Sequence, residues 1–469
     1  MRLQETECRR VRVEGCAVNR TLKPEIRNTQ KEVFLNPVII IGGGLAGCEA
    51  AWQLSRRGIN TSLYEMKPAV FSQAHRSPLL AELVCSNSFR SNATENAVGL
   101  LKEEMRLMGS LIIEAADATA VPAGKALAVD RILFSTYIEE KLVSTGLRII
   151  REEVTSIPND SVVIIAAGPL ASDTLSKSIS SVTGDEYLYF YDAISPIIEA
   201  DSIDFDKTFR ASRYDEEGTG DYLNCPMTRE EYERFWMEIS GGSEVPLRDF
   251  EDRHCFEGCL PVEILAKRGP KTLLFGPMKP VGLTDPRTGK RPYAVVQLRQ
   301  ENNNGTLYNM VGFQTKLTWP GQKHIFRMIP GLENARFARY GSIHRNTFIN
   351  SPALLKKSLQ LCSNDDLFFA GQITGVEGYV ESAAMGLMAG INVHRYMENR
   401  DMEEPPGTTA LGALLSHITN ADYKTFQPMN VNFGLFTPFT DRIPRKERGR
   451  FYAERAIDDL KKWINLNVS

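Results

Sequence analysis

The 469-residue sequence predicts an α/β fold in which a parallel sheet is interrupted by a long insertion of α+β character. A short apolar run at 37–41 is followed by a glycine-rich turn and a helix over 45–57, and strand 61–65 completes a βαβ unit. Buried-strand patterns return at 161–167 and at 367–371. Between them, residues 187–340 contain more aromatics, prolines and irregular loops. We therefore expect the last strand of the sheet to follow the insertion.

The glycine-rich turn has the pattern G-x-G-x-x-G directly after a strand and at the start of a helix. Gly42 allows the tight turn, Gly44 has no Cβ to block a pyrophosphate, and Gly47 lets helix and strand pack closely. The free N–H groups of the helix attract phosphates, and Glu65 at the end of the next strand can accept ribose hydroxyls. This predicts a Rossmann-like dinucleotide site, against the alternative of a structural glycine turn. The predicted cofactor-binding residues of this loop are Gly42, Gly43, Gly44, Leu45, Ala46 and Gly47.

The position of the motif favours FAD over NAD. It stands at the start of the ordered chain, and the strand ending at Gly168 and the segment 367–379 lie where FAD proteins of this architecture return to the cofactor. We therefore add Gly371 and Gln372 to the predicted cofactor site. The sequence has no second G-x-G-x-x-G, so NADPH or NADH would dock directly over the flavin.

The pattern along the chain predicts its organisation. We expect an FAD-binding domain made of residues 37–186 and 341–469, an insertion domain over 187–340 and a helical C-terminal tail. One helix is predicted over 98–114 and a helix of small residues over 382–395. Residues 1–36 are predicted to be a disordered extension.

Composition and charge exclude several classes of protein. Apolar residues make up 42% and charged residues 24% of the chain, which is typical of a globular protein. No run of about 18 apolar residues predicts a membrane span, and 1–36 lack the apolar core of a secretory signal. The net charge of −3 excludes a globally basic protein, so a nucleic-acid partner requires a local basic patch.

The eight cysteines have no regular spacing, which favours a reducing, cytoplasmic setting over a disulfide framework. Cys255 and Cys259 are four positions apart and His254 is adjacent to Cys255, but a zinc site needs a second pair or His residues at matched spacing, so no metal is predicted. Cys259 and Cys85 are flanked by small or polar residues and are candidate nucleophiles, although a buried structural thiol is the alternative for each. Cys48 and Cys362 are interpreted as structural, and Cys225 stays undecided.

Two basic clusters are candidates for binding phosphates or an anionic substrate. Residues 442–450 contain five basic side chains opposed by one acidic residue, an arrangement that also suits the solvated start of a helix. The smaller cluster comes close to Cys259 and is the better candidate for guiding a substrate. The clusters are Arg442, Arg445, Lys446, Arg448 and Arg450, and Lys267, Arg268 and Lys271.

Over about residues 37–465, the sequence resembles the folate- and FAD-dependent tRNA (uracil-5-)-methyltransferases, the TrmFO or Gid family. It is closer to them than to the larger MnmG/GidA family, because it lacks the long C-terminal helical extension of that family. The blocks that carry the resemblance are IGGGLAGCE at 41–49, LVCSNSFRS at 83–91, NCPMT at 224–228, FEGCLP at 256–261, FGPMKPVG at 275–282, GFQTKL at 312–317, YGSIHRNTFINSP at 340–352, FAGQITGVEGYVESAA at 369–384 and NVNFG at 430–434.

The resemblance implies methylation of uridine at C5, at position 54 in the T-loop of tRNA. Methylenetetrahydrofolate gives the carbon, and FAD reduced by NADPH or NADH gives the electrons. By resemblance, Cys259 is the thiolate that adds to uracil C6, and Cys85 is a second functional cysteine near the flavin. The target base must leave its stacked position in the T-loop to reach a buried flavin. Ribosomal RNA as target, a small-molecule flavin oxidoreductase and an RNA-binding scaffold without catalysis remain alternatives.

Overall fold

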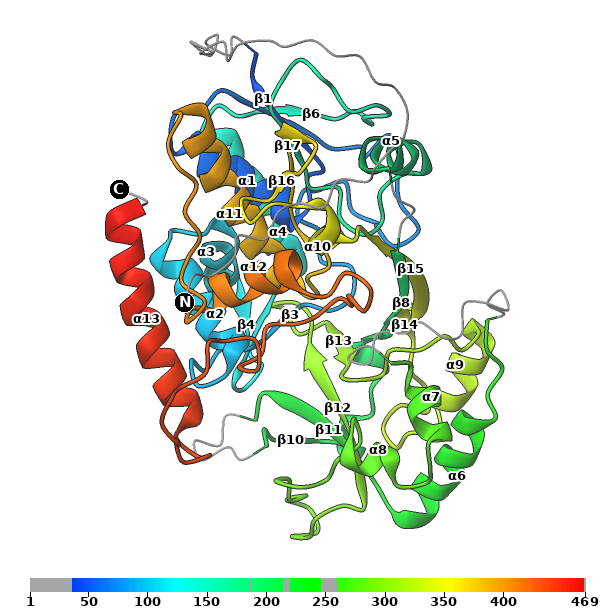
Figure 1. Ribbon diagram of the computed structural model, residues 1–469. Coiled ribbons are helices and arrows are strands. Elements are labelled where there is room, and N and C mark those ends of the chain that lie inside the picture. The colour runs from blue at the N-terminus through cyan, green and yellow to red at the C-terminus, as the bar shows by residue number, and fades with distance from the viewer. Residues whose placement is uncertain (1–35, 185–187, 214–219, 246–259, 468–469) are drawn as a thin grey trace, which may run out of the picture.

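The computed structural model describes residues 36–184, 188–213, 220–245 and 260–467. Figure 1 shows two lobes. The upper lobe contains a parallel sheet with its helices, and the lower lobe contains an antiparallel sheet with helices α6 to α9. The predicted nucleophile Cys259, the Cys255 and His254 pair and the predicted extension up to residue 35 lie outside the described ranges.

The upper lobe is built on a six-stranded sheet in the order β16-β17-β7-β1-β2-β6. All neighbours are parallel except the edge pair β16 and β17. Ile40 pairs with Leu63 on one side and with Ile164 on the other, and all three side chains are fully buried. This explains the uninterrupted apolar runs. The strands are β1 Val38–Ile41, β2 Thr61–Tyr64, β6 Arg148–Ile150, β7 Val163–Ile165, β16 Gln360–Leu361 and β17 Asn364–Phe369.

Helices α1 (Leu45–Ser55) and α11 (Tyr379–Met397) pack against each other through small residues. A Cβ added to Gly386 would overlap the backbone of Ala46, and one added to Gly390 would come within 2.8 Å of Gln53 Cβ. The two helices therefore approach more closely than larger side chains allow. The predicted small-residue helix over 382–395 corresponds to α11.

The single helix predicted over 98–114 is wrong. The chain forms two helices, α2 (Ala97–Leu107) and α3 (Leu111–Ala118). Gly109 adopts a left-handed φ of +69°, and Ser110 then caps α3 by accepting a hydrogen bond from the Ile113 N–H at 3.3 Å. Apolar periodicity continued across the break because both helices bury their faces in the same core.

The rest of the upper lobe covers this core. Figure 1 shows α13 along one side of the molecule. A small sheet in the order β3-β5-β4 lies beside α2 and α3. These elements are β3 Ser88–Ser91, β4 Ala120–Val121, β5 Ala126–Val129, α4 Arg131–Ser144, α5 Asp173–Thr183, α10 Ser351–Leu354, α12 Ala410–Asn420 and α13 Arg448–Asn467.

The lower lobe has its own apolar core between an antiparallel sheet, in the order β10-β11-β12-β13-β9-β14, and four helices. Aromatic side chains fill much of that core, among them Tyr232, Phe235, Phe313 and Phe326. The elements are β9 Ile197–Glu199, β10 Phe209–Arg210, β11 Tyr222–Met227, β12 Ala294–Gln300, β13 Leu307–Met310, β14 Phe337–Arg339, α6 Arg229–Ser240, α7 Val262–Lys267, α8 Thr272–Phe275 and α9 Trp319–Phe326.

Strands β8 (Leu188–Ile194) and β15 (Ser342–Phe348) join the two lobes. They pair with each other, antiparallel, in a separate two-stranded sheet. The chain thus leaves the upper lobe and returns to it through one ribbon. The predicted boundaries at 187 and 340 fall next to this ribbon and stay a prediction. Within the described ranges, no helix is long and apolar enough to cross a membrane.

Candidate functional site

A cavity with an empty volume of about 1030 Å³ lies at the carboxyl ends of the parallel strands. Its wall is formed by the segments that follow β1, β2, β6, β7 and β17. Ligands of open α/β sheets bind in this position, outside the strand ends. The lining includes eight of the nine residues predicted for cofactor binding, namely Gly42, Gly43, Gly44, Leu45, Ala46, Glu65, Gly371 and Gln372.

Three glycines of the loop, Gly42, Gly44 and Gly47, differ in what an added side chain would meet. Gly42 has φ +109°, and a Cβ there would lie 2.5 Å from the Ala166 oxygen. A Cβ on Gly47 would overlap the carbonyl of Gly42, so this glycine lets α1 pack on its own loop and does not line the cavity. A Cβ on Gly44 would meet no protein atom within 4 Å, because Gly44 borders the open cavity. No side chain caps the N-terminus of α1, which leaves its first N–H groups facing the cavity.

Glu65 directly follows β2 and joins the glycine loop to the next segment. Its two carboxylate oxygens accept hydrogen bonds from the backbone N–H groups of Gly43, at 3.1 Å, and Lys67, at 2.9 Å. The side chain lines the cavity although the residue is only 6% exposed. The carboxylate is thus fixed by the backbone and keeps acceptor capacity toward the cavity.

The segment after β17 also contributes to the cavity wall. Gly371, with φ +84°, lies so close to helix α1 that a Cβ would come within 2.7 Å of Ala46 Cβ. The Gln372 amide donates to the carboxyl group of Glu377 at 2.6 Å. Burial and the nearby Asp192 carboxylate raise the pKa of Glu377 well above its usual value. Sequence reasoning missed Glu377, although the positive φ of Gly375 and Gly378 on either side marks a specialised turn.

Cys85 lies next to the cavity wall on the segment after residue 82, and its side chain is half-buried. The Tyr379 hydroxyl oxygen accepts hydrogen bonds from the backbone N–H groups of Cys85, at 2.7 Å, and Ser86, at 3.1 Å. Tyr379 itself lines the cavity. Arg131 donates to the Leu83 carbonyl and forms an ion pair with Glu301 at 2.8 Å. The backbone around Cys85 is therefore held from both lobes.

Asn87 strengthens this connection between the lobes. Its side-chain N–H₂ donates to the carbonyls of Val129 and Gln300, both at 3.0 Å, and its oxygen accepts from Arg299 Nε at 2.9 Å. Asn87 is fully buried, and Arg299 and Gln300 belong to β12 of the lower lobe. A shift of β12 would therefore displace the segment that carries Cys85.

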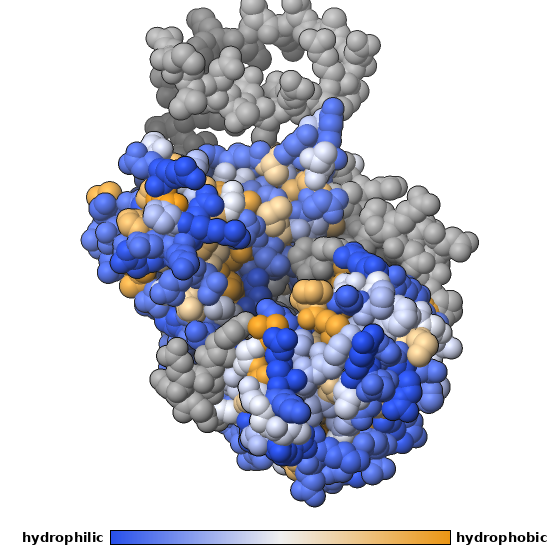
Figure 2. Space-filling model, turned by 90° about the horizontal axis from the view of Figure 1, so that it is seen from below, coloured by the Kyte–Doolittle hydropathy of each residue, from blue (hydrophilic) through white to orange (hydrophobic). Residues whose placement is uncertain are grey.

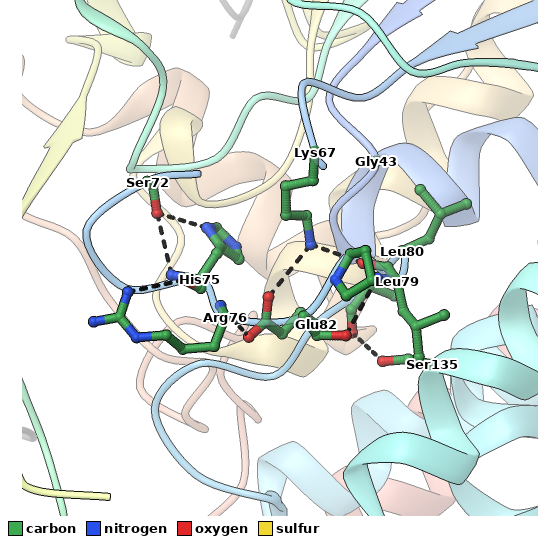
Figure 3. A network of polar contacts seen from close by, with 12 residues as sticks. Gly43, Lys67, Ser72, His75, Arg76, Leu79, Leu80, Glu82 and Ser135 are labelled. Carbon is green, nitrogen blue, oxygen red and sulfur yellow. Dashed lines mark hydrogen bonds and ion pairs between the residues drawn. The ribbon is translucent and has the colours of Figure 1, made fainter. Parts of the chain in front are cut away.

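A polar network borders the cavity beside the glycine loop (Figure 3). Lys67 Nζ donates to the Leu79 carbonyl at 2.7 Å and lies 3.4 Å from Glu82 Oε2. His75 Nδ1 lies 2.6 Å from Ser72 Oγ. Burial, together with the neighbouring Lys67 ammonium, lowers the pKa of His75 to about 4. His75 is therefore neutral at pH 7, and sequence reasoning gave no sign of it because its partners lie in an irregular loop.

No cysteine in the described ranges lines the cavity, although Cys85 directly follows the lining residue Val84. Cys48 and Cys225 are completely buried, and burial raises the pKa of both thiols. Cys362 is half-buried at the turn between β16 and β17. Among the described residues, no group of three or more His, Cys, Asp or Glu side chains is arranged to hold a metal ion.

The two basic clusters differ in their surroundings. Lys267 forms an ion pair with Glu244 at 2.6 Å, so its charge is partly compensated. Arg442, Arg445 and Lys446 precede α13 on the surface of the upper lobe. Arg450, inside α13, pairs with Glu447 at 2.7 Å. The cluster at 267–271 lies in the lower lobe, and the cluster at 442–450 lies in the upper lobe.

Comparison with known proteins agrees with this geometry. The model of the family described as "Glucose inhibited division protein A" (GIDA) matches residues 37–401. The chain is also similar to crystal structures of Aquifex aeolicus GidA. One of them has a TM-score of 0.63 and 17% identity, over 90% of this chain and 73% of that chain. This likeness supports the predicted fold class, a Rossmann-like FAD-binding α/β fold with an inserted α+β region.

Curated relatives are much more similar in sequence. A protein of Syntrophus aciditrophicus is 66% identical over 427 residues, which cover 91% of this chain and 97% of the relative. One of Geobacter sulfurreducens is 60% identical over 428 residues, covering 91% and 98%. Both are named methylenetetrahydrofolate--tRNA-(uracil-5-)-methyltransferase TrmFO. With this identity over nearly their whole length, the chain belongs to the TrmFO family of GIDA-related proteins.

Proposed function

We propose that this protein methylates C5 of a uridine in tRNA, using methylenetetrahydrofolate as the carbon donor, FAD as the bound cofactor and NADPH or NADH as the reductant. The target we propose is uridine 54 of the T-loop. The observation that carries this proposal is the 66% identity over 97% of a relative whose name states the folate, the tRNA and the uracil. Ribosomal RNA is the alternative target, with the same chemistry.

The cavity suits FAD by its shape and by its donors. Gly44 leaves room for a pyrophosphate beside the uncapped N-terminus of α1, and Glu65 offers a fixed acceptor for ribose hydroxyls. We propose that Gly371 and Gln372 border the other end of the cofactor, where their backbone approaches α1 closely. FAD bound there and reduced by NADPH or NADH would supply the two electrons that turn the transferred methylene into a methyl group. We assign the binding of FAD to residues 37–186 and 341–469.

We further propose that the Cys259 thiolate adds to uracil C6. The new S–C6 bond makes C5 nucleophilic, and it breaks again after C5 has gained its carbon and lost its proton. Cys85 is proposed as a second functional thiol at the cavity. Its position is supported by Tyr379, whose hydroxyl oxygen accepts both backbone N–H groups at Cys85 and Ser86. That arrangement leaves the Tyr379 hydroxyl proton to donate to another acceptor.

The test is an assay of the purified, FAD-loaded protein with NADPH, methylenetetrahydrofolate and an unmodified tRNA transcript. 5-Methyluridine is measured by nucleoside mass spectrometry. A transcript with cytidine at position 54 reports the site, and a ribosomal RNA fragment reports the alternative target. We expect product from the first transcript alone. Product from the ribosomal fragment only would change the target, and flavin reduction without product from either RNA would contradict the methyltransferase.

Matched cysteine variants test the roles proposed for Cys259 and Cys85. Cys259→Ala is expected to abolish 5-methyluridine formation, and Cys85→Ala to reduce it strongly. Cys362→Ala is the control, because Cys362 lies at the turn before β17, at the end of the sheet opposite the cavity. Full activity of Cys259→Ala would move the nucleophile elsewhere, with Cys85 as the first candidate.

A further inference from the structure

A continuous row of aromatic rings runs from the core of the lower lobe to its surface. Phe235 packs on Phe313 with centroids 6.3 Å apart, Phe313 on Phe326 at 5.8 Å, and Phe326 on Phe337 at 6.4 Å. Two stacked pairs finish the row. Phe337 and Tyr340 are 5.0 Å apart with 23° between planes, and Tyr340 and Trp319 are 5.4 Å apart with 15° between planes.

Trp319 ends this aromatic row and is 64% exposed, although a tryptophan normally buries most of its surface. Its position is fixed. Thr318 caps α9 by accepting the Gly321 N–H at 3.3 Å, and its own N–H donates to the Ser243 carbonyl at 2.9 Å. Pro320 restricts the next residue of the helix. These contacts fix the backbone at Trp319, and stacking on Tyr340 holds the exposed indole in place.

One ring of the row, Tyr340, is connected to the cavity wall through its neighbour in the chain. Tyr340 follows Arg339, whose guanidinium lies 3.4 Å from the Ala74 carbonyl, next to His75 of the cavity wall. Tyr340 also precedes β15, the strand that returns to the upper lobe. An RNA that contacts Trp319 in the lower lobe and also enters the cavity of the upper lobe would therefore span both lobes. On the face seen from below in Figure 2, hydrophobic residues gather near a hollow in the middle of the molecule.

Charge next to the ring favours an anionic partner. Lys323 lies four residues after Trp319 in α9, which places both on the same side of the helix. Lys323 is exposed and, within the described ranges, has no ion-pair partner. The adjacent His324 faces Glu238 at 3.4 Å, and Arg327 donates to the Ala335 carbonyl at 3.0 Å. Lys323 is therefore the charge of α9 that is available to a ligand.

We propose that Trp319 is a stacking platform for an unpaired base of the RNA substrate, with Lys323 contacting a neighbouring phosphate. The proposal rests on the function proposed above and adds a site for RNA outside the cavity. Every base has an aromatic face, so a rigid exposed indole binds an unstacked nucleotide whatever its identity. A base flipped toward the cavity leaves neighbours unstacked, and these need a new partner.

The experiment compares Trp319→Ala, Trp319→Phe and the control Met237→Ala. Met237 is 58% exposed on α6 of the same lobe and belongs to no ring contact of the row. Loss of one stacked base is expected to weaken binding of unmodified tRNA by about 5- to 100-fold and to raise the KM for tRNA. Trp319→Phe should retain most of the affinity, and Met237→Ala all of it. NADPH-dependent flavin reduction without RNA should be equal in all four proteins.

Two further readouts do not depend on affinity alone. Addition of tRNA should quench tryptophan fluorescence in the wild type, and Trp319→Phe should lose most of that change. Lys323→Gln should reduce the slope of log affinity against log salt by about one. Wild-type methylation of tRNA with unchanged affinity in Trp319→Ala would overturn the platform alone. Absence of tRNA methylation in the wild type would overturn the proposed function, and the platform with it.

Discussion

The two lobes offer a ligand different kinds of surface. In the upper lobe, the cavity is bordered by glycines and main-chain groups, and the uncapped N-terminus of α1 faces it. In the lower lobe, the prominent feature is a row of side-chain rings that ends in the exposed Trp319. A site made by the main chain leaves a signature of glycine spacing in the sequence. A site made by side chains leaves none, because aromatic residues are equally typical of a core.

The variant with the largest expected effect tests whether the two lobes are stabilised independently of each other. Phe313→Ala removes a fully buried ring from the aromatic row and should cost about 3–5 kcal/mol of unfolding free energy. Since Phe313 does not line the cavity, folded protein should bind FAD with unchanged affinity. Thermal unfolding and FAD titration measure the two effects, and Phe313→Leu is a milder control. Weakened FAD binding by folded Phe313→Leu would show that the cavity depends on the lower core.

A pair of glycine variants tests the main-chain site. Gly47→Ala would push a methyl group into the Gly42 carbonyl, and overpacking of this kind costs about 1–3 kcal/mol. Gly44→Ala meets no protein atom, so the apoprotein should keep its melting temperature while FAD affinity falls. Melting temperature and flavin fluorescence distinguish the two. Normal FAD affinity in Gly44→Ala would mean that the pyrophosphate lies elsewhere.

Glu65→Gln tests a smaller contribution within the same site. The variant keeps the shape of the side chain but loses the charge that accepts the Gly43 and Lys67 N–H groups. Hydrogen bonds to charged groups contribute about 1.5–3 kcal/mol, so FAD affinity should fall by about 10-fold or more. Equilibrium titration checks this, with Glu153→Gln, also at the cavity wall, as the control. Equal losses in both variants would argue against a specific role for Glu65.

The smallest expected effect concerns pH at the junction between the lobes. Burial and the nearby arginines lower the pKa of His344, in β15, to about 4. The unfolded chain has a histidine pKa of about 6.5, so between about pH 6.5 and 4 it binds a proton that the folded protein does not. His344 therefore stabilises the fold above pH 6.5, and this contribution is lost as pH falls toward 4. His344→Gln should show a smaller loss of urea resistance between pH 7 and 5, and an unchanged pH slope would contradict the assignment.

How far the sequence predicts the structure follows from the distance between partners. The glycine loop and Glu65 were predictable because a fixed local spacing brings them together. The bond between Tyr379 and Cys85 joins residues 294 positions apart, and the one between Arg299 and Asn87 joins residues 212 apart. Contacts between residues so far apart in the chain leave no periodic pattern in the sequence. The prediction of one helix across Gly109 was wrong for a local reason. The apolar periodicity continues past Gly109, but this single residue is left-handed and ends the first helix.

The strand order of the upper sheet also sets the timing of biosynthesis. Strand β17 lies beside β7, but about 200 residues separate Ile165 from Asn364 in the chain. A ribosome adds about 5–20 residues per second, so β7 waits about 10–40 s for its neighbour. During that interval the apolar edge of β7 is exposed, and the lower lobe is synthesised before Gly371 can close the cavity. The nascent chain therefore cannot complete this cavity until the lower lobe has left the ribosome.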